Sequence, residues 1–493
     1  MQTDVPIRLF RRLAGAGTLL TALGLVGLTA TVRGGDRDPF GNDGPLGAGY
    51  PSYRRSAPSY GGYDILQTLE EEMAQPTEET PATPPAPAYE SAAEKEAAPE
   101  EPAAAPPEVW NLTNIFTDCE GHNTFKDSGI KISGHMQWGW VSNPDGAFTG
   151  NGPALNEKQW GFFGLQQAYL YAEKVADGSK GLGWGFRLDG LYGLQGFDGQ
   201  SFGNINVGHW DFLNGFDHNP YNWAIPQAYG ELAYGKWSIK LGHFYTIVGY
   251  EVVPSTAQFF ITRQLTFWNS EPFTHTGALN TYKVNDKFTV LAGWVAGMDT
   301  GFYQFNGGSS ILGGFSWTID EKTTLAYSMI GGNLGWRGDG AINSAILSRQ
   351  WTPKFSTVHQ FDVLASNLDL LNANTIPRFN IPSGTFSFGN VPSDFNQQGG
   401  VPRQSQGFIN YAFYDLTPKV KLGFRGEWFN ADNVDYYTFT YGINWKPHPN
   451  LLIRPELRHM VSPENHLIYT GAGGFSGNIY NQVVYAADFI VIF

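Results

Sequence analysis

The sequence predicts an all-β fold: a closed antiparallel transmembrane β-barrel of about 16 strands, preceded by an export signal and a disordered tail. Three observations support this prediction: an aromatic-rich and glycine-rich composition, runs of alternating polar and apolar residues, and a strict alternation of short and long connections. Of the 493 residues, 15% are aromatic and 61 are Gly. Strands that carry aromatic girdles and bend at glycine have this composition, whereas helical enzymes do not.

The clearest alternating run covers residues 419–428, with the sequence KVKLGFRGEW. Successive side chains of a strand point to opposite faces, so Lys421, Arg425 and Glu427 share one face. The pattern recurs at 130–140, 184–189, 451–458 and 483–493. A membrane barrel turns its apolar face to lipid and its polar face to a wet lumen. In the run at 419–428, the apolar face consists of Val420, Leu422, Phe424 and Trp428.

The connections between these runs alternate between short and long. The short ones are rich in Gly, Asp, Asn, Pro and Lys, the composition of tight hairpin turns. Alternation gives an even strand number near 16 and places both ends of the barrel on the short-turn side, which is periplasmic in such barrels. The short turns are 176–180, 234–236, 285–287, 320–322, 352–354, 417–419 and 446–450. The other connections are 142–160, 195–223, 245–273, 298–309, 331–341, 369–406, 430–434 and 461–479.

The segment before the barrel divides into three parts. Residues 1–32, with Arg8, Arg11 and Arg12 before an uncharged stretch, indicate a signal peptide, and an uncleaved anchor is the alternative. Residues 33–107 are first rich in Gly, Pro and Tyr and then in Pro, Ala and Glu, which predicts a disordered periplasmic spacer with one short helix at 63–75. Residues 108–127 lead into a barrel at 128–493.

Charge and cysteine content narrow the choice of partners. Of the formal net charge of −14, residues 1–124 carry −10. The barrel region is therefore nearly balanced, and it has no basic patch for nucleic acid. Cys119 is the only cysteine, so no internal disulfide is possible.

Several blocks resemble the putative beta-barrel porin-2 (OmpL-like) family over roughly residues 128–493. The blocks are IPQAYGEL at 225–232, LGHFYTIVGYE at 241–251, EPFTHTG at 271–277, RGEWF at 425–429 and RPELR at 454–458. The terminal Phe493 resembles the signal read by the outer-membrane barrel-assembly machinery. The resemblance implies a channel in the outer membrane of a double-membraned bacterium and leaves its solute open.

The charged residues on the polar faces of strands are candidates for lining a water-filled lumen. Both signs occur two residues apart, so these charges either pair with one another or form a field across the pore, and we expect weak ion selectivity. The candidates are Arg187, Asp189, Glu231, Lys240, Lys421, Arg425, Glu427, Arg454, Glu456, Arg458 and Asp488.

The connection at 245–273 is the candidate constriction loop. It carries Glu251 and Arg263 together with four aromatic side chains that favour an anchored position over a solvated one. The alternatives are an external cap and a subunit contact in a homotrimer. The aromatic residues are Phe259, Phe260, Phe267 and Trp268.

The sequence thus predicts a passive channel for small hydrophilic solutes. The alternative is a barrel-anchored surface protein whose long loops bind a partner, matrix or carbohydrate. A lipid hydrolase is disfavoured because no nucleophile-elbow context is present, and a soluble all-β carbohydrate binder is the fallback. No cofactor is expected. No metal site is expected either, because the spacing of His209, His218, His243 and His275 matches no ligand motif.

Overall fold

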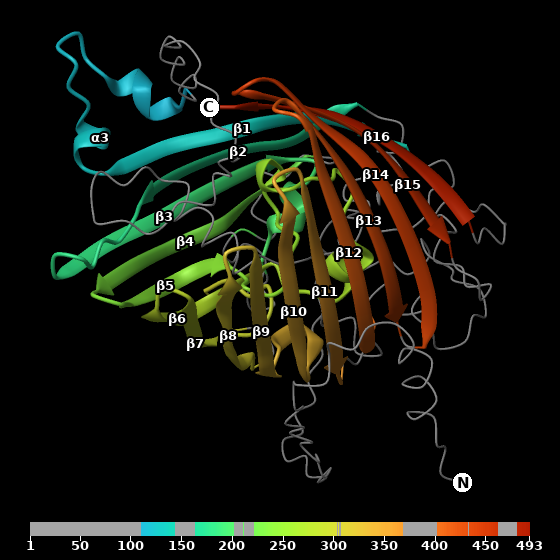
Figure 1. Cartoon of the computed structure of the whole chain (residues 1–493). Helices are drawn as coiled ribbons and strands as arrows, with labels where there is room; N and C mark the ends of the chain where they lie inside the picture. Colours follow the sequence, from blue (N-terminus) through green and yellow to red (C-terminus); the bar gives the residue numbers. More distant parts are fainter. Residues whose placement is uncertain are drawn as a thin grey trace, which may run out of the picture. The chain divides into compact units, whose positions relative to one another are not determined.

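The computed structural model describes residues 110–142, 163–201, 211, 221–302, 304, 307–367, 402–431, 433–461 and 481–493. The predicted signal peptide at 1–32, the spacer at 33–107 and the short helix at 63–75 lie outside the described residues. Within the described part of the chain, 16 antiparallel strands follow one another in sequence order and close into a barrel (Figure 1). The closed antiparallel barrel and its strand number are as predicted.

The first half of the barrel contains strands β1 to β8. They are β1 (Ile130–Val141), β2 (Gly164–Lys174), β3 (Leu182–Gly193), β4 (Asn222–Tyr234), β5 (Trp237–Tyr245), β6 (Thr274–Asn285), β7 (Phe288–Val295) and β8 (Ser309–Asp320). The second half is β9 (Thr323–Asn333), β10 (Asp339–Thr352), β11 (Phe355–Ser366), β12 (Gln404–Thr417), β13 (Val420–Ala431), β14 (Val434–His448), β15 (Leu451–Val461) and β16 (Asn481–Ile492).

The barrel closes where β1 pairs with β16, with His135 opposite Ile492. Beyond the last strand, the carbonyl oxygen of Phe493 accepts hydrogen bonds from Ser133 Oγ at 2.6 Å and from the Gly134 N–H at 2.6 Å. Closure leaves no unpaired strand edge, which removes the usual site of edge-to-edge aggregation.

Short helices occupy some of the connections and the segment before β1. They are η1 (Leu112–Phe116), α3 (Thr124–Asp127), η3 (Gly196–Gly199), η4 (Ser255–Ala257), α4 (Leu265–Asn269) and η5 (Gly335–Arg337). In the part of the chain that the structure describes, none of these helices has the length and apolar character needed to cross a bilayer.

The outer face of the barrel is apolar and exposed. Trp and Tyr side chains gather near the short turns, and aliphatic side chains lie farther along the strands. Leu170, Leu188, Leu241 and Ile311, for example, are 48–65% exposed. This is the surface composition that a lipid environment stabilises. The aromatic residues near the short turns are Trp184, Tyr234, Trp237, Tyr282, Trp317, Trp351, Tyr414 and Trp445.

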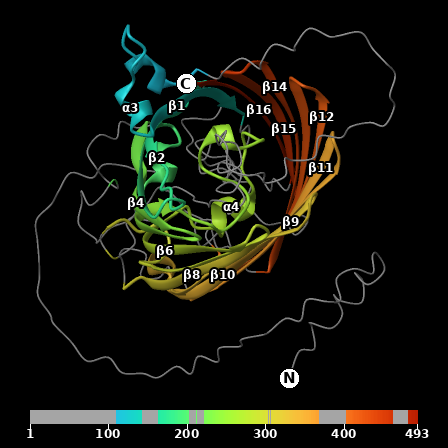
Figure 2. The same cartoon turned by 60° about the vertical axis from the view of Figure 1, so that its left-hand side comes forward.

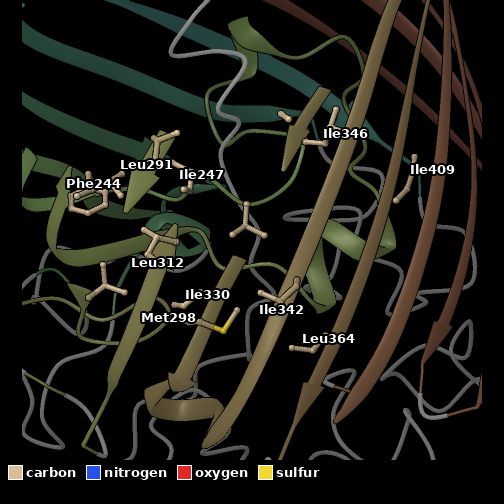
Figure 3. Close-up of a cluster of buried hydrophobic side chains, with 14 of the residues drawn as sticks. Phe244, Ile247, Leu291, Met298, Leu312, Ile330, Ile342, Ile346, Leu364 and Ile409 are labelled. Atoms are coloured by element: carbon tan, nitrogen blue, oxygen red, sulfur yellow. The ribbon is translucent and has the colours of Figure 1, made fainter. Parts of the chain in front are cut away.

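The inner face differs between sectors. On β6 to β12 the inward positions nearer the long loops carry buried aliphatic side chains, which form one cluster with side chains of residues 246–273 (Figure 3). Leu312, Ile330 and Ile342 are fully buried there. The inner face of a membrane barrel is usually polar because it contacts water. Here the inner wall can be apolar because a connecting segment covers it.

Candidate functional site

The site is the barrel interior, where residues 246–273 between β5 and β6 form what we call the inner loop. This loop contains η4 and α4, and Figure 2 shows α4 inside the ring of strands. Its side chains are almost all buried: Val248, Leu265 and Thr266 are 0% exposed. The segment predicted as a constriction loop therefore lies inside the barrel and does not cap it from outside.

Two carboxylates of the wall hold backbone N–H groups of the inner loop. Glu427 on β13 accepts from the N–H groups of Leu265 and Thr266, each at 2.8 Å, at the start of α4. Glu456 on β15 accepts from the N–H of Ile261 at 2.6 Å and of Thr262 at 3.3 Å. Charge-assisted hydrogen bonds of this kind are stronger than neutral ones. They satisfy buried backbone donors of an irregular segment, including the first N–H groups of α4, which have no partner within a helix.

Three arginines of the same wall hold backbone carbonyl groups of the loop. Arg454 on β15 donates to the carbonyl oxygens of Ser255 at 2.9 Å and Gln258 at 2.8 Å. Arg458 donates to the Arg263 carbonyl at 2.6 Å. Arg425 on β13 donates to the Thr262 carbonyl at 2.8 Å. The alternating Arg and Glu residues of β13 and β15 thus bind the acceptors and donors of one irregular backbone.

Glu251 and Arg263, the two charged residues predicted in the constriction, also lie in the interior. Glu251 forms a buried ion pair with Arg425 and accepts from the Gln264 N–H at 2.8 Å. Arg263 donates to the Val253 carbonyl at 2.8 Å, and its guanidinium lies 5.3 Å from the Phe267 ring centre. Both residues therefore fix the path of the loop.

Two glycines on the inner face make room for the aromatic side chains of the loop. A Cβ added at Gly423 would lie 2.2 Å from a Phe259 ring atom, and one at Gly442 would lie 3.0 Å from the Phe260 ring. Glycine lets a partner approach a strand more closely than any other residue does. The phenylalanines predicted to anchor the loop therefore pack against positions that lack side chains.

A buried carboxyl pair joins the loop to β11. Gln360 Nε2 donates to Glu271 of the loop at 2.7 Å and to Asp362 at 3.0 Å. Burial, followed by the neighbouring Asp362 carboxyl, raises the pKa of Glu271 well above its ordinary value of 4.5.

We expect this pair to make the folded protein less stable as pH rises. Near pH 4.5 and below, Glu271 is protonated when folded, and above that value the unfolded chain releases its proton first. Stability therefore falls from about pH 4.5 up through the raised pKa. Glu271→Gln should flatten this dependence in thermal unfolding scans of detergent-solubilised protein. Glu120→Gln, an exposed carboxyl outside the barrel, should not, and an equal effect of the two variants would contradict the assignment.

The other predicted pore-lining residues lie elsewhere on the inner face. Arg187 donates to Asp189 at 2.9 Å and to Glu173 at 3.2 Å. Glu231 and Lys240 face each other across β4 and β5, and both are half-buried. Two further ion pairs involve predicted pore-lining residues: Arg454 with Asp488 at 3.0 Å, and Lys421 with Asp415 at 3.8 Å.

Some interior polar residues were not among the predicted pore-lining residues. Glu173 and Gln167 have the same inward alternation as their neighbours and could have been found from it, and Gln137 lies on the polar face of the alternating run at 130–140. Gln167 Nε2 donates to the Val253 carbonyl at 2.8 Å, and Ser255 Oγ donates to Gln137 at 2.6 Å, so both glutamines bind the loop. No sequence signal distinguished Glu271 and Asp362 as neighbours, because 91 positions separate them.

The histidines considered for a metal site have other contacts. His243 lies 3.0 Å from Ser201 Oγ and 2.7 Å from Thr276 Oγ1, and His275 lies 2.8 Å from Thr246 Oγ1. His209 and His218 lie outside the described residues. In the described ranges, no three His, Cys, Asp or Glu side chains are placed to bind one metal ion.

Comparison with known proteins identifies the family. No curated protein matches the chain. Among solved structures, the fold is similar to the outer membrane channel DcaP of Acinetobacter baumannii, with 9% identity, a TM-score of 0.46 and coverage of 74% of this chain and 98% of that one. An anion-selective porin from Comamonas acidovorans gives 10% identity, a TM-score of 0.44 and coverage of 74% and 99%.

The sequence profile of one family, described as "Putative beta-barrel porin-2, OmpL-like", matches residues 129–493. This range contains every strand of the barrel in the described part of the chain, and the inner loop as well. Membership in a beta-barrel porin family points to a channel rather than an enzyme. The chain therefore belongs to the putative beta-barrel porin-2, OmpL-like, family.

Proposed function

We propose that the chain is an outer-membrane channel through which small hydrophilic solutes diffuse passively. The observation that carries the proposal is a division of the inner face. The inner loop covers the wall of β13 and β15, whereas charged and tyrosine side chains on β1 to β5 stay partly exposed nearer the short turns. Water can reach that exposed part, and a passing solute would contact it.

In this proposal the inner loop constricts the channel, with Glu251 and Arg263 among its fixed residues. Arg425, Glu427, Arg454, Glu456 and Arg458 hold the loop and contribute little field to the solute path. Glu231 and Lys240 line that path, Arg187 and Asp189 are buried next to it at 9% and 1% exposed, Lys421 lies near the short-turn end and Asp488 is paired behind the loop. Because the charges on the path are paired, ion selectivity should be weak.

The membrane placement is also part of the proposal. The apolar outer face, with its aromatic belt near the short turns, supports a barrel that crosses the outer membrane with those turns in the periplasm. Residues 1–32 would then act as a signal peptide and residues 33–107 as a periplasmic spacer. The last strand, ending in Phe493, would be the segment that the barrel-assembly machinery recognises. A homotrimer is consistent with this placement.

Single-channel recording from refolded protein in a planar bilayer tests the proposal. We expect steady conductance steps and, in a salt gradient, a reversal potential close to zero because the paired charges offset each other. Correctly inserted protein without conductance would contradict the proposal and favour a barrel-anchored surface protein that binds a partner through its long loops.

A further inference from the structure

The inner face changes from covered to accessible within two residues along β2. Tyr169 is 2% exposed, and its hydroxyl lies 2.9 Å from that of Tyr245, the last residue of β5 before the inner loop. Two residues nearer the short turns, Tyr171 is half-buried, and so are Glu173 beyond it and Tyr229 on β4. A solute that enters from the short-turn side therefore meets a wall of side chains that the loop leaves partly uncovered.

These side chains form a continuous group, which we call the tyrosine–charge band. It spans five neighbouring strands, because Lys131 on β1 faces Glu173 on β2, Glu173 faces Arg187 on β3, and Arg187 faces Tyr229 on β4. One residue pair nearer the turns, Glu231 on β4 faces Lys240 on β5. The band consists of the exposed or half-buried Lys131, Tyr171, Glu173, Tyr229, Glu231 and Lys240, together with Arg187 and Asp189, which are buried among them at 9% and 1% exposed.

The charges of the band balance one another. Three cations and three carboxylates give a net charge of zero at neutral pH. Arg187 lies 2.9 Å from Asp189 and 3.2 Å from Glu173, and Lys240 is directly opposite Glu231. An ion of either sign would be attracted by one charge of the band and repelled by the neighbouring charge of opposite sign. Its net electrostatic attraction to the band would therefore be small. The band is therefore poorly suited to selecting ions.

The two tyrosines have cations over their rings. The Arg187 guanidinium lies 4.3 Å from the ring centre of Tyr171, and the Lys240 ammonium lies 5.1 Å from that of Tyr229. The Lys131 ammonium also lies 5.7 Å from the Tyr171 ring centre. These contacts fix both rings beside hydrogen-bond donors, a planar guanidinium at Tyr171 and an ammonium at Tyr229. Aromatic faces next to such groups match a molecule with C–H faces and neighbouring hydroxyl groups.

The wall of the barrel opposite the band also bears on which class of solute would bind. In a closed barrel of 16 strands, β9 to β11 lie across from β1 to β3. Their half-buried inward residues nearest the short turns are Thr324, Ser348 and Ser356. Hydroxyl groups donate and accept hydrogen bonds without adding charge, so this wall also favours an uncharged polar solute.

We propose that the tyrosine–charge band is a binding site for neutral saccharides on the solute path. The inference rests on the proposed channel function and names its solute class. Saccharide hydroxyl groups would bind the accessible carboxylates of Glu173 and Glu231 and the ammonium groups of Lys131 and Lys240, and the sugar ring would pack against the uncovered parts of Tyr171 and Tyr229.

The test uses the full-length mature protein in a planar bilayer, with maltotriose as the probe. Maltotriose should interrupt the open-channel current in proportion to its concentration. The double variant Tyr171→Ala/Tyr229→Ala should weaken this block about tenfold, in line with the loss of two aromatic contacts. Tyr171→Phe/Tyr229→Phe should retain most of it. Tyr234→Ala, which removes an exposed tyrosine of the outer face of β4, should leave the block unchanged.

The outcomes separate the two proposals. Open conductance without any maltotriose block would overturn the saccharide site and leave the channel standing. A stronger block by citrate or by spermidine than by maltotriose would also overturn it, because the site would then select charge. An absence of conductance in inserted protein would reject the channel and with it the site. Normal open conductance of each variant shows that the variant has folded.

Discussion

Replacement of Arg425 by methionine should destabilise the folded barrel by about 3–5 kcal/mol, the cost of breaking a buried ion pair from one side. Arg425 is 0% exposed, pairs with Glu251 and donates to the Thr262 carbonyl at 2.8 Å. Its loss leaves Glu251 buried without its cation and frees one side of the inner loop. Thermal unfolding in detergent should show the loss of stability, and bilayer recording should show a larger, noisier current.

A matched control lies on the same strand and the same face. The Lys421 side chain is 40% exposed and lies 3.8 Å from Asp415, so its ion pair is screened by water. Lys421→Met should change the stability by less than about 1 kcal/mol and leave the current steady. If the two variants behave alike, the effect of Arg425 comes from lost charge and not from its contact with the loop.

Gly423→Leu should displace the inner loop while the barrel stays closed. A Cβ at this position would lie 2.2 Å from the Phe259 ring, so a larger side chain cannot share the space. Overpacking of this kind costs about 1–3 kcal/mol. The expected result is a folded protein, judged by heat-modifiable gel mobility, with a higher conductance than the parent.

The control for this substitution is Gly230→Leu on β4. Gly230 belongs to the outer face, where an added Cβ would meet no described atom within 4 Å. This variant should keep both the mobility and the conductance of the parent. A Gly423→Leu protein with the parent's conductance would show that Phe259 does not hold the loop near the pore.

The barrel could be predicted from the sequence because its signals are local. A strand such as 420–431 alternates residue by residue, and the short turns carry their own residue types. The alternation of short and long connections then gives the strand number. Each of these signals spans fewer than about 15 residues, so neither tertiary contacts nor the path of the loops is needed to read them.

The role of the interior charges could not be predicted in the same way. Alternation shows that Arg425, Glu427 and Glu456 point inward, and the sequence then suggests a charged wall in contact with water. Their partners are backbone groups at 261–266, about 160 to 195 positions away, and a backbone group leaves no trace in the sequence. The aliphatic inner wall around Ile330 and Ile342 was missed for the same reason, because only a covering segment makes it favourable.

The central claim is that the inner loop lies fixed against the wall of the barrel, and a cysteine pair tests it most directly. Ser270 Oγ of the loop lies 2.6 Å from Ser405 Oγ of β12. Cys119→Ser removes the native thiol, and Ser270→Cys with Ser405→Cys then places two thiols at this contact. Mass spectrometry after mild oxidation counts the free thiols and so shows whether the two cysteines have cross-linked. The conductance is recorded before and after oxidation. We predict that both thiols disappear and the conductance stays unchanged, whereas two free thiols in folded protein, or a large change in conductance on cross-linking, would contradict the claim.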